Sequence, residues 1–227
     1  MLLKFVDKSA QKSSIVSTTA SIEKKSMKKR IGIFGGSFDP PHFGHLHLAT
    51  SMMHMCGLDE VWFCPTAGNP LKTGRALVSI DDRLQMLKAA IADEKRFKII
   101  DIEAKKKPPC YTVDTLRDLH KTNEMAHLEF FFILGDDVVA NFHLWKEPDA
   151  IIDLATIVVG TRDAKPFFFN QKLSEKVMQS LKKGVVNISL VPISSTDVRY
   201  RLAKGLSCQS LVPSKVLDYI TSHHLYL

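Results

Sequence analysis

The chain has 227 residues, 45% of them hydrophobic, and a formal net charge of +7 at pH 7. Its length fits one domain, and it contains no run of about 18 apolar residues that would cross a membrane. Residues 1–30 contain eight basic and two acidic side chains, whereas residues 31–227 contain 23 and 22. The positive charge therefore belongs to the N-terminal segment, and the composition argues against nucleic acid as a partner of the folded part.

Residues 1–27 are rich in Ser, Thr and Lys and lack the apolar segment of a secretory signal. We interpret them as a disordered extension, or as a non-native one if translation starts at Met27, before a single domain over residues 28–227. The four cysteines form no CxxC pair, which favours a reducing compartment. We therefore expect a cytoplasmic protein.

Short apolar runs alternate with amphipathic segments along the rest of the chain. Several of the apolar runs have no polar face, which is typical of parallel strands covered by helices on both sides. The alternation predicts a doubly wound parallel α/β sheet with right-handed crossovers and a small C-terminal helical part. The predicted strands are Arg30–Phe34, Glu60–Cys64, Phe97–Ile102, Glu129–Leu134, Thr156–Val159 and Asn187–Val191.

Helix starts are marked by capping residues and prolines. A helical pattern covers Leu46–Met55, and Ser79 and Thr112 each precede an apolar periodicity as candidate N-caps. Pro148 and Pro213 both suit the first position of a helix, because proline needs no N–H partner there.

The segment Gly35–His45 joins the first predicted strand to the first helix. Its paired glycines allow backbone N–H groups to approach an anion closely, and the helix N-terminus adds a positive dipole end. His42 and His45 lie three residues apart, so both rings can contact one phosphate chain. Because ligands of such sheets bind at the carboxyl ends of the strands, we expect a phosphate site at this turn.

Two motifs resemble those of the nucleotidyltransferase superfamily. Ser37–His45 matches its Ser/Thr-Phe-Asp-Pro-x-His-x-Gly-His signature, and Ile193–Arg199 resembles its Ile-Ser-Ser-Thr-x-Ile-Arg motif. Within the superfamily, the chain looks most like the nicotinate-mononucleotide adenylyltransferase branch, from about Lys28 to the C-terminus. The resemblance implies a Rossmann-like fold and transfer of the adenylyl group of ATP to nicotinate mononucleotide, with pyrophosphate leaving, in NAD biosynthesis.

The resemblance also implies residue roles on the ATP side. His42, His45 and Arg199 would stabilise the transition state, since the task is to neutralise charge on the α-phosphate and the leaving group. Imidazoles, main-chain amides and an Arg fork suit that task. The implied ATP-binding residues are Gly35, Gly36, Ser37, Phe38, His42, His45, Gly135, Asp137, Ser194, Ser195, Thr196 and Arg199.

On the acceptor side, Tyr111–Leu116 resembles a family segment that meets the pyridine nucleotide. Thr112 at a helix start can donate to a pyridine carboxylate, whose charge the helix dipole favours. Trp145 matches a tryptophan that stacks on the pyridine ring, although a core or lid aromatic is almost as simple an interpretation. Lys72 and Arg162 complete the acceptor-binding residues that the resemblance implies.

Two positions depart from the family pattern. Leu71 stands where relatives carry a histidine, so the usual phosphate contact of that loop would fall to Lys72 as a point charge. Lys146 follows Trp145 where an aromatic residue is usual. Both departures keep open a nucleotide-binding regulator without turnover.

The histidines, the serine motif and the acceptor each permit a second interpretation. His42, His45 and His47 have the spacing of a metal site, the histidines can simply cap their helix, and Ser194–Asp197 alone would be an ordinary N-cap. Nicotinamide mononucleotide and phosphopantetheine are also possible acceptors. ATP chemistry implies Mg²⁺, which would bind phosphate oxygens and water without a dedicated protein cage. The expected partners are ATP and nicotinate mononucleotide, and a homo-oligomer is left open.

Overall fold

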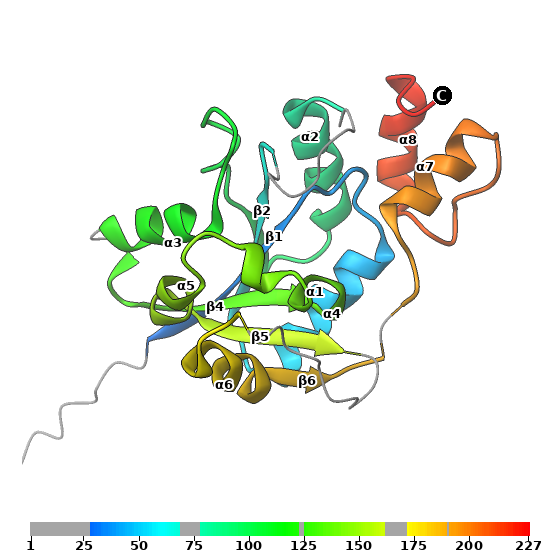
Figure 1. Ribbon diagram of the computed structural model, residues 1–227. Coiled ribbons are helices and arrows are strands. Elements are labelled where there is room, and N and C mark those ends of the chain that lie inside the picture. Colours follow the sequence, from blue (N-terminus) through cyan, green and yellow to red (C-terminus); the bar gives the residue numbers. More distant parts are fainter. Residues whose placement is uncertain (1–27, 69–77, 123–124, 162–171, 190) are drawn as a thin grey trace, which may run out of the picture.

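A computed structural model describes residues 28–68, 78–122, 125–161, 172–189 and 191–227. Its centre is a six-stranded sheet in which every neighbouring pair is parallel, in the order β3-β2-β1-β4-β5-β6. The strands are β1 (Lys29–Gly36), β2 (Glu60–Pro65), β3 (Phe97–Ile99), β4 (Leu128–Gly135), β5 (Thr156–Thr161) and β6 (Val185–Asn187). This arrangement confirms the predicted Rossmann-like α/β fold (Figure 1).

The helices follow the strands in the alternation that the sequence predicts. They are α1 (Phe43–Met55), α2 (Ile80–Ile91), α3 (Thr112–Lys121), α4 (Asp136–Val139), the 3-10 turn η2 (Phe142–Leu144), α5 (Pro148–Leu154), α6 (Glu175–Lys183), α7 (Ser195–Ala203) and α8 (Ser214–Ser222). Ser79 is the N-cap of α2, and its Oγ accepts from the backbone N–H of Asp82. Pro148 occupies the first turn of α5, as predicted.

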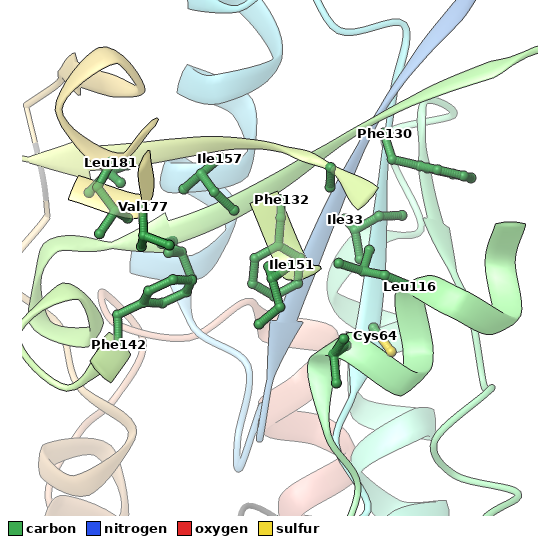
Figure 2. Packing of buried hydrophobic residues seen from close by; sticks show 14 of the residues in the cluster. Ile33, Cys64, Leu116, Phe130, Phe132, Phe142, Ile151, Ile157, Val177 and Leu181 are labelled. Atoms are coloured by element: carbon green, nitrogen blue, oxygen red, sulfur yellow. The ribbon is translucent and has the colours of Figure 1, made fainter. Parts of the chain in front are cut away.

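Strand β4 shows why helices cover both faces of the sheet. Successive side chains of a strand point to opposite faces. Phe130 and Phe132 pack with α3, α5 and α6, whereas Phe131 and Ile133 pack with α1 and α2. Figure 2 shows the first of these clusters, in which Leu116 of α3, Ile151 of α5 and the paired Val177 and Leu181 of α6 face the sheet. Two separate apolar layers therefore hold the sheet.

Helix α1 packs against β5 at Gly160. A Cβ atom at Gly160 would come within 2.5 Å of Leu48 Cδ1 and 2.8 Å of Met52 Cε, both on α1. The side chains of Leu48 and Met52 therefore pack directly over the glycine, and a larger residue at this position would require them to shift. The position of α1 determines where its N-terminal histidines lie, so this packing bears on the site.

Helices α7 and α8 form the predicted C-terminal helical part, which lies beyond the sheet (Figure 1). A third apolar cluster is found there. It joins Met86 of α2 to Val198 of α7 and to Val216 and Ile220 of α8, all fully buried. Tyr219 Oη of α8 also donates to Asp82 Oδ1 of α2 at 2.9 Å. Helices α7 and α8 are thereby attached to α2 rather than to the sheet.

Several predicted boundaries are wrong. The strand predicted at Asn187–Val191 is β6 at Val185–Asn187, because the β-branched Val185 pairs with β5 directly after the helix and β5 ends at Thr161, the partner of Asn187. Strand β3 ends at Ile99 rather than Ile102. Tyr111, not Thr112, is the N-cap of α3, and Pro213 is the N-cap of α8 rather than its first helical residue.

The strand order reverses between β1 and β4, whose carboxyl ends are at Gly36 and Gly135. Ligands of open parallel sheets bind at such a reversal. The predicted phosphate turn begins at this point of the sheet. Within the described residues, no helix is both long and apolar enough to cross a membrane.

Candidate active site

The turn after β1 is built around a buried phenylalanine. Phe38 has a positive φ of 48° and is 1% exposed. Its ring packs edge-on against Phe34, Phe63 and His45, with centroid distances of 5.0–5.6 Å. A Cβ atom at Gly36 would lie 2.8 Å from this ring, so only glycine fits beneath it. The ring therefore fixes the course of the backbone that carries the predicted phosphate-binding amides.

The two histidines of the motif lie face to face at the start of α1. Their ring centroids are 3.7 Å apart with an interplanar angle of 25°. The backbone N–H of His42 donates to Nδ1 of His45 at 3.2 Å. Because that nitrogen accepts, the proton of a neutral His45 ring resides on Nε2, which makes Nε2 a hydrogen-bond donor.

His42 is buried and uncharged at neutral pH. It is 5% exposed, and desolvation lowers its pKa from 6.5 to about 4. Its Nδ1 atom is buried and has no hydrogen-bond partner among the described residues. A buried polar atom without a partner is uncommon and often marks a place that a ligand or water completes.

The metal and capping interpretations of these histidines have different outcomes. The His-x-x-His-x-His metal site is wrong, because His47 Nε2 contacts Ser51 Oγ at 3.4 Å and no group of three metal-binding side chains occurs in the described part of the chain. The capping interpretation is correct in part. His42 is the N-cap of α1, and the His45 side chain accepts from its backbone.

The second motif meets the first one directly. Ser194 is the N-cap of α7, where its Oγ accepts from the N–H of Asp197 at 3.1 Å, as the capping interpretation predicts. Ser195 Oγ donates to the carbonyl of Pro40 at 2.9 Å, across 155 residues of sequence. This bond places the N-terminus of α7 against the loop that leads to the two histidines.

Arg199 joins the same two segments. Its Nη1 donates to the carbonyl of Asp39 at 2.6 Å, and its Nη2 donates to Thr196 Oγ1 at 2.8 Å. These bonds account for two of its five N–H donors. The guanidinium thus connects the N-terminal turn of α7 to the Gly35–His45 loop, which is called the phosphate loop below because a phosphate site is predicted there.

Arg83 of α2 is a buried cation beneath the same loop. It is 2% exposed, and its Nη1 donates to the carbonyls of Ser37 and Thr66, both at 2.8 Å. It therefore ties the chain beyond β1 to the chain beyond β2. Burial lowers its pKa, and the negative charge of Asp39 acts in the opposite direction.

The carboxyl end of β4 places Gly135 and Asp137 beside β1. Asp137 is exposed, and a Cβ atom at Gly135 would lie only 2.6 Å from its Oδ1. The carboxylate folds back over the glycine and lies at the strand end next to the phosphate loop in the sheet order.

The candidate acceptor residues Thr112 and Trp145 belong to segments that are held together. Trp145 is half-buried and packs against Phe132 and Phe142, with centroids 5.9 and 5.0 Å away. Lys146 pairs with Asp114 of α3 at 2.9 Å, and its ammonium lies 4.9 Å from the centroid of the Tyr111 ring. The Trp145 segment therefore lies against the N-terminus of α3, where Thr112 is half-buried.

Comparisons with known proteins identify the family of the chain. Residues 33–201 match the cytidylyltransferase-like family. A protein of Desulfitobacterium hafniense named "Probable nicotinate-nucleotide adenylyltransferase" is 36% identical over 200 residues, which cover 87% of this chain and 96% of the relative. A Bacillus anthracis protein of the same name is 38% identical over 198 residues, with 87% and 98% covered. The chain belongs to the nicotinate-nucleotide adenylyltransferase family.

Solved structures share the fold of this nicotinate-nucleotide adenylyltransferase family member. The Plasmodium falciparum nicotinic acid mononucleotide adenylyltransferase complexed with NaAD superposes with a TM-score of 0.66 at 22% identity, covering 87% of this chain and 97% of that one. The same enzyme complexed with APC gives a TM-score of 0.64 at 21% identity, with the same coverage. At this level of identity the likeness supports the architecture.

Within this family member, the structure adds residues to those that the sequence predicted. Arg83 lies one helical turn before Leu87 on the apolar face of α2, and a cation on that face was a signal that could have indicated it. Tyr226, whose hydroxyl donates to Asp39 Oδ1 at 2.6 Å, had no such signal, because the two residues are 187 positions apart in the sequence. Leu71, Lys72 and Arg162 lie outside the described residues, so their assigned positions stay predictions.

Proposed function

We propose that this chain transfers the adenylyl group of ATP to nicotinate mononucleotide and forms nicotinate adenine dinucleotide and pyrophosphate. The observation that carries the proposal is the joint site of the two family motifs. The stacked rings of His42 and His45 lie beside a loop that Ser195 and Arg199 hold from α7. Family membership supplies the reaction, and this joint site supports its assignment to these residues.

The reaction requires positioning more than acid–base chemistry. A phosphate oxygen of the mononucleotide forms a bond to the α-phosphorus of ATP, and the bond from that phosphorus to the pyrophosphate oxygen breaks. The nucleophile is already an anion at neutral pH, so no strong base is needed. The site must bring two anions together and stabilise the charge that develops on the α-phosphate and the pyrophosphate.

The histidines suit that requirement as hydrogen-bond donors. In this proposal, Nε2–H of His45 donates to a phosphate oxygen, since its Nδ1 already accepts from the backbone. His42 is neutral in the absence of substrate. A bound triphosphate would favour the protonated form of His42 and would give its buried Nδ1 atom a hydrogen-bond partner.

Main-chain amides and Arg199 provide the remaining donors in the proposal. The amides of Gly36, Ser37 and Phe38 would contact the α-phosphate side, and the N-terminus of α7 would receive the β- and γ-phosphates. Ser195 uses its hydroxyl to bind Pro40, so its contribution to a phosphate is assigned to its backbone N–H. The remaining donors of Arg199 would complete the triphosphate site.

The acceptor is proposed to lie between Thr112 and Trp145. The N-terminus of α3 favours a pyridine carboxylate over the neutral amide, because the helix dipole stabilises an anion there. Lys146 adds a cation near this end, although its pair with Asp114 reduces its field. The Trp145 ring offers a face on which a planar pyridinium can stack.

Magnesium is proposed to arrive with ATP. The described residues hold no cluster of three metal-binding side chains, which fits an ion bound mainly by phosphate oxygens and water. When bound, Mg²⁺ would neutralise charge on the phosphates of ATP. The cytoplasm is proposed as the compartment, and four cysteines without disulfide bonds agree with reducing conditions.

One experiment tests the proposal. The purified chain is incubated with ATP, Mg²⁺ and one acceptor at a time: nicotinate mononucleotide, nicotinamide mononucleotide or phosphopantetheine. Products are identified by mass, and pyrophosphate is measured in parallel. We expect nicotinate adenine dinucleotide as the main product. Faster turnover of another acceptor would contradict the assigned substrate, and ATP binding without any product would identify a nucleotide-binding regulator.

A further inference from the structure

The C-terminal end of the chain reaches the phosphate loop. Tyr226, the penultimate residue, donates its hydroxyl to Asp39 Oδ1 at 2.6 Å, across 187 residues of sequence. Asp39 is 1% exposed and lies between Phe38 and His42 in the loop. A movement of this carboxylate would therefore displace both the predicted amide donors and the histidine pair.

Asp39 is the buried anion between two cations. Arg199 Nη1 lies 3.9 Å from Asp39 Oδ2 and donates to the Asp39 carbonyl. Arg83 binds the carbonyl of Ser37, and the charge of Asp39 acts to raise its pKa. A buried carboxylate loses its hydration, and both opposite charges and hydrogen bonds are required to offset that loss. The Tyr226 hydroxyl provides one of these bonds.

The backbone after α8 adopts an unusual conformation that places the Tyr226 hydroxyl beside Asp39. His224 and Tyr226 both have positive φ angles, of 51° and 63°. Non-glycine residues adopt this conformation at an energetic cost, so the surrounding contacts must hold it. The backbone N–H of Leu225 donates to the carbonyl of Ile220 at 3.0 Å, and Tyr226 is half-buried against the cluster of α2, α7 and α8.

We propose that Tyr226 is a positioning residue for adenylyl transfer: its hydroxyl holds the Asp39 carboxylate, and through it the loop that binds the triphosphate. The inference rests on the proposed function for its kinetic consequence. Tyr226 itself has no assigned contact with substrate. The third apolar cluster acquires a role beyond stability, because it presents this side chain to the active site.

The chain offers a matched control. Tyr219 on α8 makes the same kind of bond, from its hydroxyl to Asp82 Oδ1 at 2.9 Å, and Asp82 lies outside the phosphate loop. Tyr226→Phe and Tyr219→Phe each remove one hydroxyl that binds a carboxylate. Both variants keep the aromatic ring, so any general loosening of the C-terminal helices should affect them alike.

The test measures turnover and ATP binding in the full chain. For Tyr226→Phe we expect kcat/KM for ATP to fall about 10-fold, the rate equivalent of one hydrogen bond to a charged group. The Kd for ATP should rise, and the KM for nicotinate mononucleotide should stay the same. Tyr219→Phe should match the wild type in these kinetic and binding constants. Thermal unfolding of each variant shows that the assays are made on folded protein.

Two outcomes would overturn the inference: unchanged ATP kinetics and binding in Tyr226→Phe, or equal losses in both variants. Calorimetric ATP binding keeps the inference testable without turnover. If the wild type binds ATP but makes no dinucleotide, the proposed function fails. A weaker ATP affinity that is confined to Tyr226→Phe would then still support the positioning role.

Discussion

The ring of His42 shows how burial determines the state of a side chain in this site. An imidazole at the surface would be partly protonated near pH 6.5, whereas His42 has a pKa of about 4 because it is desolvated. The neutral ring can stack on His45 at 3.7 Å without charge repulsion. The pair is therefore preorganised before any anion binds.

This burial predicts a pH dependence of stability. The folded pKa lies below the unfolded value, so the unfolded chain binds more protons between about pH 6.5 and pH 4. Stability must fall as the pH falls through that window. We expect the free energy of unfolding to decrease by about 2 kcal/mol from pH 7 to pH 5 on account of this group. Urea unfolding at both pH values measures the change.

His42→Gln provides the comparison for the pH effect, because it removes the titrating ring. Between pH 7 and pH 5, the unfolding free energy of His42→Gln should decrease by about 2 kcal/mol less than that of the wild type. Glu94, whose bonds to Arg96 lower its pKa from 4.5 to about 2, contributes stability that is present above its unfolded pKa and is lost as the pH falls from 4.5 to about 2, so it changes little between pH 7 and pH 5. A wild-type slope that survives in His42→Gln would assign the effect to other groups.

The second ring carries a kinetic prediction. His45→Ala should lower kcat by about 10²- to 10³-fold, the usual cost of losing a donor that stabilises transition-state charge. Pyrophosphate release at saturating substrates measures it. His47→Ala on the same helix is the control, since the ring of His47 contacts Ser51 Oγ at 3.4 Å. Equal activity in the two variants would remove His45 from the catalytic assignment.

At the scale of an element, helix α2 supports the loop after β1 through the side chain of Arg83. Arg83→Met keeps the length and removes the guanidinium, which leaves the carbonyls of Ser37 and Thr66 without this donor. We expect the free energy of unfolding to fall by about 3 kcal/mol, because unpaired buried acceptors are costly. Urea unfolding of the variant measures the loss.

Gln85→Met on the same helix is the matched control for Arg83→Met. Gln85 is exposed and receives the same new residue, so its unfolding free energy should stay within about 0.5 kcal/mol of the wild type. Adenylyl transfer should fall only in Arg83→Met, since the Ser37 carbonyl orients the peptide whose N–H belongs to Phe38. If Arg83→Met is as stable and as active as the wild type, the loop after β1 keeps its conformation without the Arg83 guanidinium.

The elements also show what the sequence could predict. Apolar strands such as β4 and the two motif segments were found from local patterns, because burial on both faces and glycine-histidine chemistry are visible in adjacent residues. The position of β6 was missed, since its register depends on its pairing with β5. Tyr226 was missed because its role depends on a contact 187 residues away.

At the scale of the molecule, the site is assembled from segments that are far apart in sequence. The turn after β1, the start of α7 and the C-terminal residues meet through the bonds of Ser195, Arg199 and Tyr226. The third apolar cluster holds two of these segments against α2. Local motifs predict the chemistry, and we expect the relative position of the two motifs to depend on this cluster as well.

Deletion of the N-terminal segment tests whether residues 28–227 are sufficient for adenylyl transfer. Deletion of residues 1–27 removes five basic and two acidic side chains and leaves β1 and the site contacts intact. We expect kcat and both KM values to stay within about twofold of the full chain, because no assigned catalytic group is lost. If the tail binds nucleic acid, affinity for a duplex at low salt should disappear on deletion while adenylyl transfer persists. A large loss of turnover in the shortened chain would instead place part of the active site in the tail.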